Sequence, residues 1–123
     1  MAIVPYCSLN QWAIKKEFAT FAAYTVINNS PTEAELTEML EEMTELMNSE
    51  VGSVSTNLTT HLTVLRNMCY RGVELMLDEE QARATETNRD VGIPRDYMFE
   101  RDREKLRRFG TEEGYRVVGG VAS

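Results

Sequence analysis

Apolar residues recur every three or four positions from Ser55 to Ala84, and this spacing predicts one long helix. No proline interrupts the segment, and its single glycine, Gly72, costs only about 1 kcal/mol relative to alanine. The apolar stripe is too broad for an isolated solvated helix, so other segments are expected to pack on it. The residues predicted to form the stripe are Leu58, Leu62, Leu65, Met68, Cys69, Val73, Met76 and Leu77.

Two shorter helices are predicted before the long one, near residues 9–26 and 33–51, and each begins with a capping box. Ser8 and Gln11 have the spacing in which each side chain bonds the other residue's backbone amide, and Thr32 and Glu35 repeat it. The Asn-Asn-Ser-Pro sequence at 28–31 separates the two helices. The residues predicted to face the core are Trp12, Ala13, Phe18, Phe21, Ala22, Leu36, Met39, Leu40, Met43, Leu46, Met47 and Val51.

A fourth helix is predicted near residues 96–109, after a turn-forming Asp-Val-Gly-Ile-Pro sequence, with Gly110 as its stop. Its apolar residues are Tyr97, Met98, Phe99, Leu106 and Phe109. The remaining tail has strand-like residues but no partner strand elsewhere in the chain. The predicted fold is therefore an all-α bundle of about four helices around one long central helix, with a helical domain at 1–110 and an extended C-terminal arm at 111–123.

The charge of −7 is distributed unevenly along the 123 residues. Residues 1–65 contain two bases and eight acids, a net −6, and residues 66–123 contain eleven bases and twelve acids, a net −1. An acidic first half is a poor surface for nucleic acid, because duplex binding depends on clustered Lys and Arg. No run of about 18 apolar residues is present, so no membrane span is predicted, and the N-terminus lacks the pattern of a secretory signal.

The sequence contains no pattern typical of a catalytic, cofactor or metal site. His61, the only histidine, has Thr59, Thr60 and Thr63 nearby but no recognisable orienting acid, so a partly buried or surface histidine is the preferred interpretation. Cys7 and Cys69 are expected to be reduced thiols in an intracellular protein. Phosphate-binding loops, Cys-x-x-Cys pairs and nucleophile elbows are missing, so the chain is predicted not to be an enzyme. A cryptic carboxylate metal site is the remaining enzymatic alternative.

The segment between residues 33 and 51 is acidic and rich in methionine. Its carboxylates do not have the Glu-x-x-His spacing of helical di-metal sites. They predict a solvated face, or else a surface that meets a basic partner or lines a pore. The methionines predict core packing, with an adaptable binding groove as the alternative. The acidic residues are Glu38, Glu41, Glu42 and Glu45, and the methionines, counted with two from the long helix, are Met39, Met43, Met47, Met68 and Met76.

The only basic cluster lies in the predicted fourth helix, at Arg101, Arg103, Lys105, Arg107 and Arg108. Acidic residues alternate with it, so six bases and four acids between residues 95 and 108 leave a net +2. This pattern favours a mixed-charge solvated helix, with an ion-paired interface as the alternative.

The order of these elements resembles the head–tail connector proteins of tailed bacteriophages, also called adaptor or head-completion proteins. The resemblance rests on the Tyr6-Cys7-Ser8-Leu9 start, the Ser-Pro-Thr-x-x-Glu sequence at 30–35 and the acidic helix that follows it. It extends, as a pattern, over most of the chain. The break at 28–31 comes later than in the family, which makes the first helical region longer than expected.

The resemblance implies a small helical virion protein without catalytic residues or cofactor. Such proteins form a homo-oligomeric ring beneath the portal, continue the DNA channel and offer an attachment surface to the next neck or tail protein. DNA would pass through a lumen lined by Glu38, Glu41, Glu42 and Glu45 without sequence-specific binding. The portal or subunit interface would comprise Arg101, Arg103, Lys105, Arg107, Arg108, Tyr115, Arg116, Val117 and Val118. The expected location is the virion neck, between capsid and tail, after assembly in the host cytoplasm.

A second function remains open from the same residues. A small acidic helical regulator or inhibitor could present the carboxylates of residues 33–50 to a basic protein partner. That protein would form a one-to-one complex, whereas a connector forms a ring.

Overall fold

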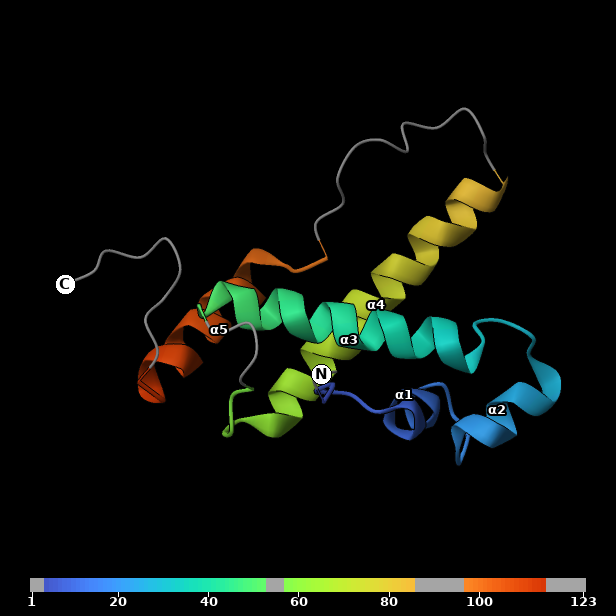
Figure 1. Cartoon of the computed structure of the whole chain (residues 1–123), viewed down its shortest axis with the longest axis horizontal. Coiled ribbons are helices and arrows are strands. Elements are labelled where there is room, and N and C mark those ends of the chain that lie inside the picture. The colour runs from blue at the N-terminus through green and yellow to red at the C-terminus, as the bar shows by residue number, and fades with distance from the viewer. Residues whose placement is uncertain (1–3, 53–56, 86–96, 115–123) are drawn as a thin grey trace.

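The computed structural model describes residues 4–52, 57–85 and 97–114, with the side chains of 81–85 excepted. Within these ranges the chain forms five helices and no strand, which confirms the predicted all-α fold. Helix α3 crosses α4 near the middle of the molecule, and α2 and α5 lie at opposite ends of its longest axis (Figure 1). The helices are α1 (Leu9–Lys15), α2 (Phe21–Ile27), α3 (Glu33–Glu50), α4 (Leu62–Thr85) and α5 (Glu100–Glu112).

The predicted helix over 9–26 is wrong in one respect, because the chain forms two helices there. Helix α1 ends at Lys15, and Glu17 has the positive φ of 73° that a helix C-terminus needs. The amide of Phe18 donates to the carbonyl of Ala13, which completes the Schellman hydrogen-bond pattern. Thr20 then caps α2. The turn brings Phe21 and Tyr24 against Trp12, so aromatic packing compensates for the interrupted helix.

Helix α3 matches its prediction closely, with the Thr32–Glu35 capping box formed and Val51 as the C-terminal cap. The Ser8–Gln11 capping box is also formed at the start of α1. These boundaries depend on side chains within a few residues of the helix end, which is why the local sequence predicts them well.

The long central helix begins at Leu62 rather than Ser55, and Ser55 itself lies outside the described residues. Residues 57–61 are not helical, because side chains far away in the sequence bind their amides. Glu113 accepts from the amides of Thr59 and Thr60, at 2.9 Å in each case. Leu62, predicted in the core, is 56% exposed at the first position of the helix.

Helix α5 also differs from its prediction at its described end. It continues through Gly110 to Glu112, so Thr111 and Glu112 belong to the helix and not to an extended arm. A glycine inside a helix costs only about 1 kcal/mol, and burial of Leu106 and Phe109 in the turn that precedes Gly110 offsets that cost. Gly114, with φ of 92°, follows the C-cap Glu113. The helix begins at Glu100 with Phe99 as its N-cap, so Tyr97, Met98 and Phe99, predicted to lie in the helix, precede it. The predicted start at Asp96 and the arm from 115 to 123 lie outside the described residues.

The core forms mainly where α3 and α4 cross, and the five methionines of the predicted stripe are all buried there. Core packing is therefore the role of these methionines in the described structure. Most other predicted core residues are buried or half-buried. Besides Leu62, the exceptions are Ala22, which is exposed, Leu46, which is 36% exposed, and Phe99, which is 49% exposed.

Candidate functional site

The four predicted carboxylates of α3 form one outward-facing surface, called here the acidic face: Glu38, Glu41, Glu42 and Glu45. Their spacing of three and four residues places them opposite the buried stripe. Glu41 is half-buried and the other three are exposed. No base occurs in α3, and within the described ranges none of the four carboxylates forms an ion pair. Within the described residues, no base neutralises the acidic face.

The predicted basic interface on α5 is divided between two roles. Arg103 Nη1 lies 2.6 Å from Glu50 Oε2 of α3, and Arg107 Nη2 lies 3.2 Å from Glu50 Oε1. These two bases hold α5 against the end of α3. Arg101 and Arg108 are exposed, each over a neighbouring phenylalanine ring, and Lys105 is half-buried. Tyr115, Arg116, Val117 and Val118 lie outside the described residues.

Asp102 is the one acid of α5 that is buried, and it joins α5 to α4. Its carboxylate is 3% exposed and accepts from Arg71 Nη2 at 3.0 and 2.9 Å. The mixed-charge pattern of the predicted fourth helix favoured a solvated position for Asp102, which is wrong for this residue. Its helical spacing to the buried Leu106 and Phe109 is the signal that identifies the inward position.

His61 takes part in a structural clamp at the other end of α5. Its Nε2 lies 2.9 Å from Glu112 Oε1, and its ring stacks on Phe109 with centroids 4.0 Å apart. The hydroxyls of Thr59 and Thr60 donate hydrogen bonds to the carboxylate of Glu113 and not to the imidazole of His61. The described geometry brings no nucleophile together with His61.

Glu113 is the most strongly perturbed carboxylate of this clamp. Burial raises the pKa of Glu113. Hydrogen bonds from the hydroxyl of Thr60, the amides of Thr59 and Thr60 and the hydroxyl of Thr59 outweigh burial and lower the pKa to about 2. The ionised carboxylate thus stabilises the non-helical turn before α4.

The Tyr6-Cys7-Ser8 motif has a structural role at each position. The hydroxyl of Tyr6 donates to Asn48 Oδ1 at 2.5 Å and accepts from the amide of Leu58 at 2.7 Å, so it connects α3 to the segment before α4. Cys7 is completely buried, and Ser8 caps α1. The motif therefore fixes the N-terminal segment to the helical core.

Both cysteines are free and buried. Burial raises the pKa of the Cys7 thiol to about 12 and that of Cys69 to about 11. The charge of Cys69 raises the Cys7 pKa further, whereas a hydrogen bond with Thr44 lowers that of Cys69 in part. Protonated thiols of this kind are weak nucleophiles.

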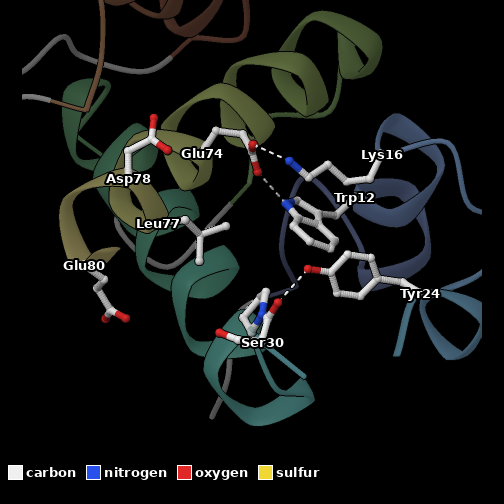
Figure 2. Close-up of a pocket in the computed structure, with 9 residues that line it drawn as sticks. Trp12, Lys16, Tyr24, Ser30, Glu74, Leu77, Asp78 and Glu80 are labelled. Atoms are coloured by element: carbon white, nitrogen blue, oxygen red, sulfur yellow. Dashed lines mark hydrogen bonds and ion pairs between the residues drawn. The ribbon is translucent and has the colours of Figure 1, made fainter. Parts of the chain in front are cut away.

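A pocket of about 450 Å³ lies between α1, α2, the link to α3 and one side of α4 (Figure 2). Glu74 Oε1 accepts from Lys16 Nζ at 2.7 Å, and Glu74 Oε2 accepts from Trp12 Nε1 at 2.9 Å. Tyr24 Oη donates to the carbonyl of Ser30 at 2.6 Å. The lining is completed by Pro31, Leu77, Asp78 and Glu80. This pocket was not predicted from the sequence, because its walls come from segments more than forty residues apart.

Among the described residues, no set of three His, Cys, Asp or Glu side chains is placed to hold a metal ion. No described helix is long and apolar enough to cross a membrane.

No protein-family model, curated protein or solved structure matches the chain.

Proposed function

We propose that this chain is a structural virion protein, a ring-forming connector between the head and tail of a tailed virus. It docks on the portal, extends the DNA channel and provides the attachment surface for the next neck or tail protein. In this proposal it is located in the virion neck and acts without a cofactor.

The observation that carries the proposal is the unneutralised acidic face of α3. Three of its carboxylates are exposed and Glu41 is half-buried, and the four are closely spaced without bases on their own helix. A channel lined by repeated copies of this face would repel DNA phosphates, so packaged DNA could pass without adhering. The negative potential of a single copy would have little effect on DNA, whereas a ring would place many copies of the acidic face around one channel and strengthen that potential.

The proposal also draws on the sequence resemblance, whose residues have structural roles here. The Tyr6–Leu9 sequence of the connector resemblance fixes the chain to α3 and starts α1, and the Thr32–Glu35 sequence starts the acidic helix. The residues that carry the resemblance thus have definite structural roles, as expected if the pattern specifies one fold.

The docking part of the proposal involves α5 and the residues that follow it. Arg103 and Arg107 are paired with Glu50 inside the chain, so Arg101, Lys105 and Arg108 are the bases offered to partners. The segment 115–123, with Tyr115, Arg116, Val117 and Val118, would reach a neighbour or the portal and add backbone hydrogen bonds by strand addition.

Deletion of residues 115–123 tests this docking role. The deletion should begin after Gly114, because Glu113 binds Thr59 and Thr60 and its removal would disturb the fold. The truncated chain should keep its helical circular-dichroism spectrum and fail to join necks on portal-containing capsids. Normal incorporation of the truncated chain would refute the docking role.

Substitution of the acidic face tests the channel. A variant with Glu38, Glu41, Glu42 and Glu45 changed to Gln should still assemble, because these side chains make no ion pair in the described structure. A ring in which the same residues are Lys should retain short duplex DNA at low salt, whereas the wild-type ring should not. Loss of assembly in the Gln variant would contradict a lumen position for the acidic face.

The same acidic face supports a second candidate, a regulator that binds a basic protein. This alternative predicts a one-to-one complex and no ring. The Gln variant then loses its partner altogether, because the four carboxylates are the binding surface. Assembly of the Gln variant therefore separates the two functions.

A further inference from the structure

Cys7 and Cys69 meet inside the core, although they lie 62 positions apart in the sequence. Both are free and completely buried. The backbone amide of Cys7 donates a hydrogen bond to the Sγ of Cys69. The Sγ of Cys7 is three covalent bonds from that amide nitrogen, so rotation of the Cys7 side chain brings the two sulfurs together. Only long contacts with backbone carbonyls oppose this rotation among the described hydrogen bonds of the thiols, at 3.7 Å to Ser8 for Cys7 and 3.8 Å to Leu40 for Cys69.

Thr44 of α3 gives a second sign that the chain around Cys7 lies on the Cys69 thiol. Thr44 Oγ1 accepts from the amide of Tyr6 at 3.0 Å, and it lies 3.7 Å from Cys69 Sγ. One hydroxyl therefore contacts both the residue before Cys7 and the sulfur of Cys69. The two cysteines are the ends of a contact that joins the start of the described chain to the middle of α4.

Residues 4–7, called here the N-terminal segment, cover the Cys69 thiol without forming a helix. Side-chain hydrogen bonds hold the segment, and the hydroxyl of Tyr6 makes two of them: it donates to Asn48 Oδ1 and accepts from the amide of Leu58. A short non-helical segment held by a few hydrogen bonds opens more readily than packed helices do. Opening of this segment brings the Cys7 thiol into solvent while the helices stay packed.

We propose that Cys7 and Cys69 are an oxidation site, which a low-molecular-weight disulfide converts into an intramolecular disulfide that locks the N-terminal segment onto α4. When the segment opens, the sulfur of Cys7 attacks the small disulfide, forms a mixed disulfide and releases one small thiol. When the segment closes, the sulfur of Cys69 attacks the Sγ of Cys7 and releases the second small thiol. In each step the leaving thiolate takes up the proton that the attacking cysteine loses. Two electrons pass from the cysteine pair to the small disulfide.

The bond forms only in an oxidising medium, because the glutathione pool of a reducing cytoplasm keeps such a pair as thiols. A connector would therefore assemble with the two thiols reduced, and its N-terminal segment would become locked after the particle leaves the cell. Formation of the bond does not require a ring, so failure of the connector function would leave the oxidation site in place.

Incubation of the full chain with oxidised glutathione at pH 8 tests the oxidation site. Mass spectrometry without reductant should show a monomer that has lost two hydrogens, and peptide mapping should join the Cys7 peptide to the Cys69 peptide. The bond closes a loop of about sixty residues, so the oxidised chain should melt about 10 °C above the reduced chain. Disulfide-linked dimers or mixed disulfides as the only products would overturn the proposal, as would an internal bond that lowers the melting temperature.

Two single variants are the controls for the chemistry. Cys69→Ala should stop at the mixed disulfide on Cys7, because the second sulfur is missing. Cys7→Ala should react at a small fraction of the wild-type rate, because Cys69 stays covered. Treated and untreated samples of the same variant are compared, so that any loss of stability caused by the substitution cancels. A rise of about 10 °C in either treated variant would contradict the proposed bond.

The opening of the N-terminal segment has its own test. Tyr6→Phe removes the hydroxyl that binds Asn48 and Leu58, so it should speed formation of the internal disulfide about fivefold. Tyr24→Phe is the matched control, because it removes a hydroxyl that donates to the carbonyl of Ser30, away from the segment. It should leave the rate unchanged. Equal rates in Tyr6→Phe and wild type would show that the segment does not control access to the two thiols.

Discussion

Asp102 of α5 is buried against Arg71 of α4, and both of its carboxylate oxygens accept from the same guanidinium nitrogen at 3.0 and 2.9 Å. The two side chains differ in solvent access, because that of Asp102 is 3% exposed and that of Arg71 is 36% exposed. Removal of the Arg71 side chain and removal of the Asp102 side chain should therefore destabilise the fold by different amounts. A buried carboxylate without its partner is costly, whereas a half-exposed guanidinium can turn toward water.

Arg71→Ala should destabilise the fold more than Asp102→Ala. We expect a loss of about 3 kcal/mol in the free energy of unfolding for Arg71→Ala and about 1–2 kcal/mol for Asp102→Ala. Urea denaturation followed by circular dichroism measures both. The double variant Arg71→Met, Asp102→Leu is the control and should lie close to wild type, because no charge is left buried. Equal losses in the two single variants would contradict this interpretation.

Gly72 is predicted to be essential at the crossing of α3 and α4. A Cβ atom placed there would lie 2.2 Å from Met43 Sδ and 2.6 Å from Met43 Cε, and Met43 is completely buried. Gly72→Ala should therefore cost about 1–2 kcal/mol, because overpacking exceeds the gain in helix propensity. In a Met43→Ala background the same change should become neutral or stabilising by up to about 1 kcal/mol. An unchanged cost in that background would exclude the contact as the cause.

The Glu113 carboxylate predicts a loss of stability in acid. Its folded-state pKa of about 2 lies below its ordinary value of 4.5. Its contribution is thus fully present above that ordinary value and is lost as the pH falls toward the folded-state pKa. NMR titration of the Glu113 side chain should show the low pKa directly. Glu113→Gln should unfold with a flatter dependence on acid pH, whereas Glu42→Gln should keep the wild-type dependence.

The two buried thiols should make the folded protein less stable as the pH rises, which is the opposite of the effect expected from Glu113. Burial raises the pKa of Cys7 to about 12 and of Cys69 to about 11, from ordinary values of 9.0. Their contribution to stability is present below the ordinary value and is lost as the pH rises through the folded-state values. In the native protein both thiols should react slowly with a chromogenic disulfide reagent, and denaturant should make them react at the rate of free cysteine. Rapid reaction of the native protein would show that the thiols are accessible.

The sequence predicted those parts of the fold that depend on nearby residues. The capping boxes at Ser8 and Thr32, the length of α3 and the outward position of the acidic face all follow from spacings of three and four residues. The all-α class follows from the same periodicity.

The boundaries that failed depend on contacts distant in the sequence. The break between α1 and α2 uses Glu17 in a left-handed conformation, where a glycine would have given a visible signal. The start of α4 depends on Glu113, more than fifty residues away. The pocket likewise needs Trp12, Pro31 and Glu74 brought together by the fold. The hydrophobic periodicity of one helix does not show which distant residues the fold brings into contact.

Assembly on a portal can be measured by native mass spectrometry of the purified chain, alone and mixed with a candidate portal protein. We predict a predominantly monomeric chain at the low concentrations of that measurement, and a high-order ring once the portal is added. A monomer or dimer that ignores the portal would contradict the connector function and favour the acidic regulator.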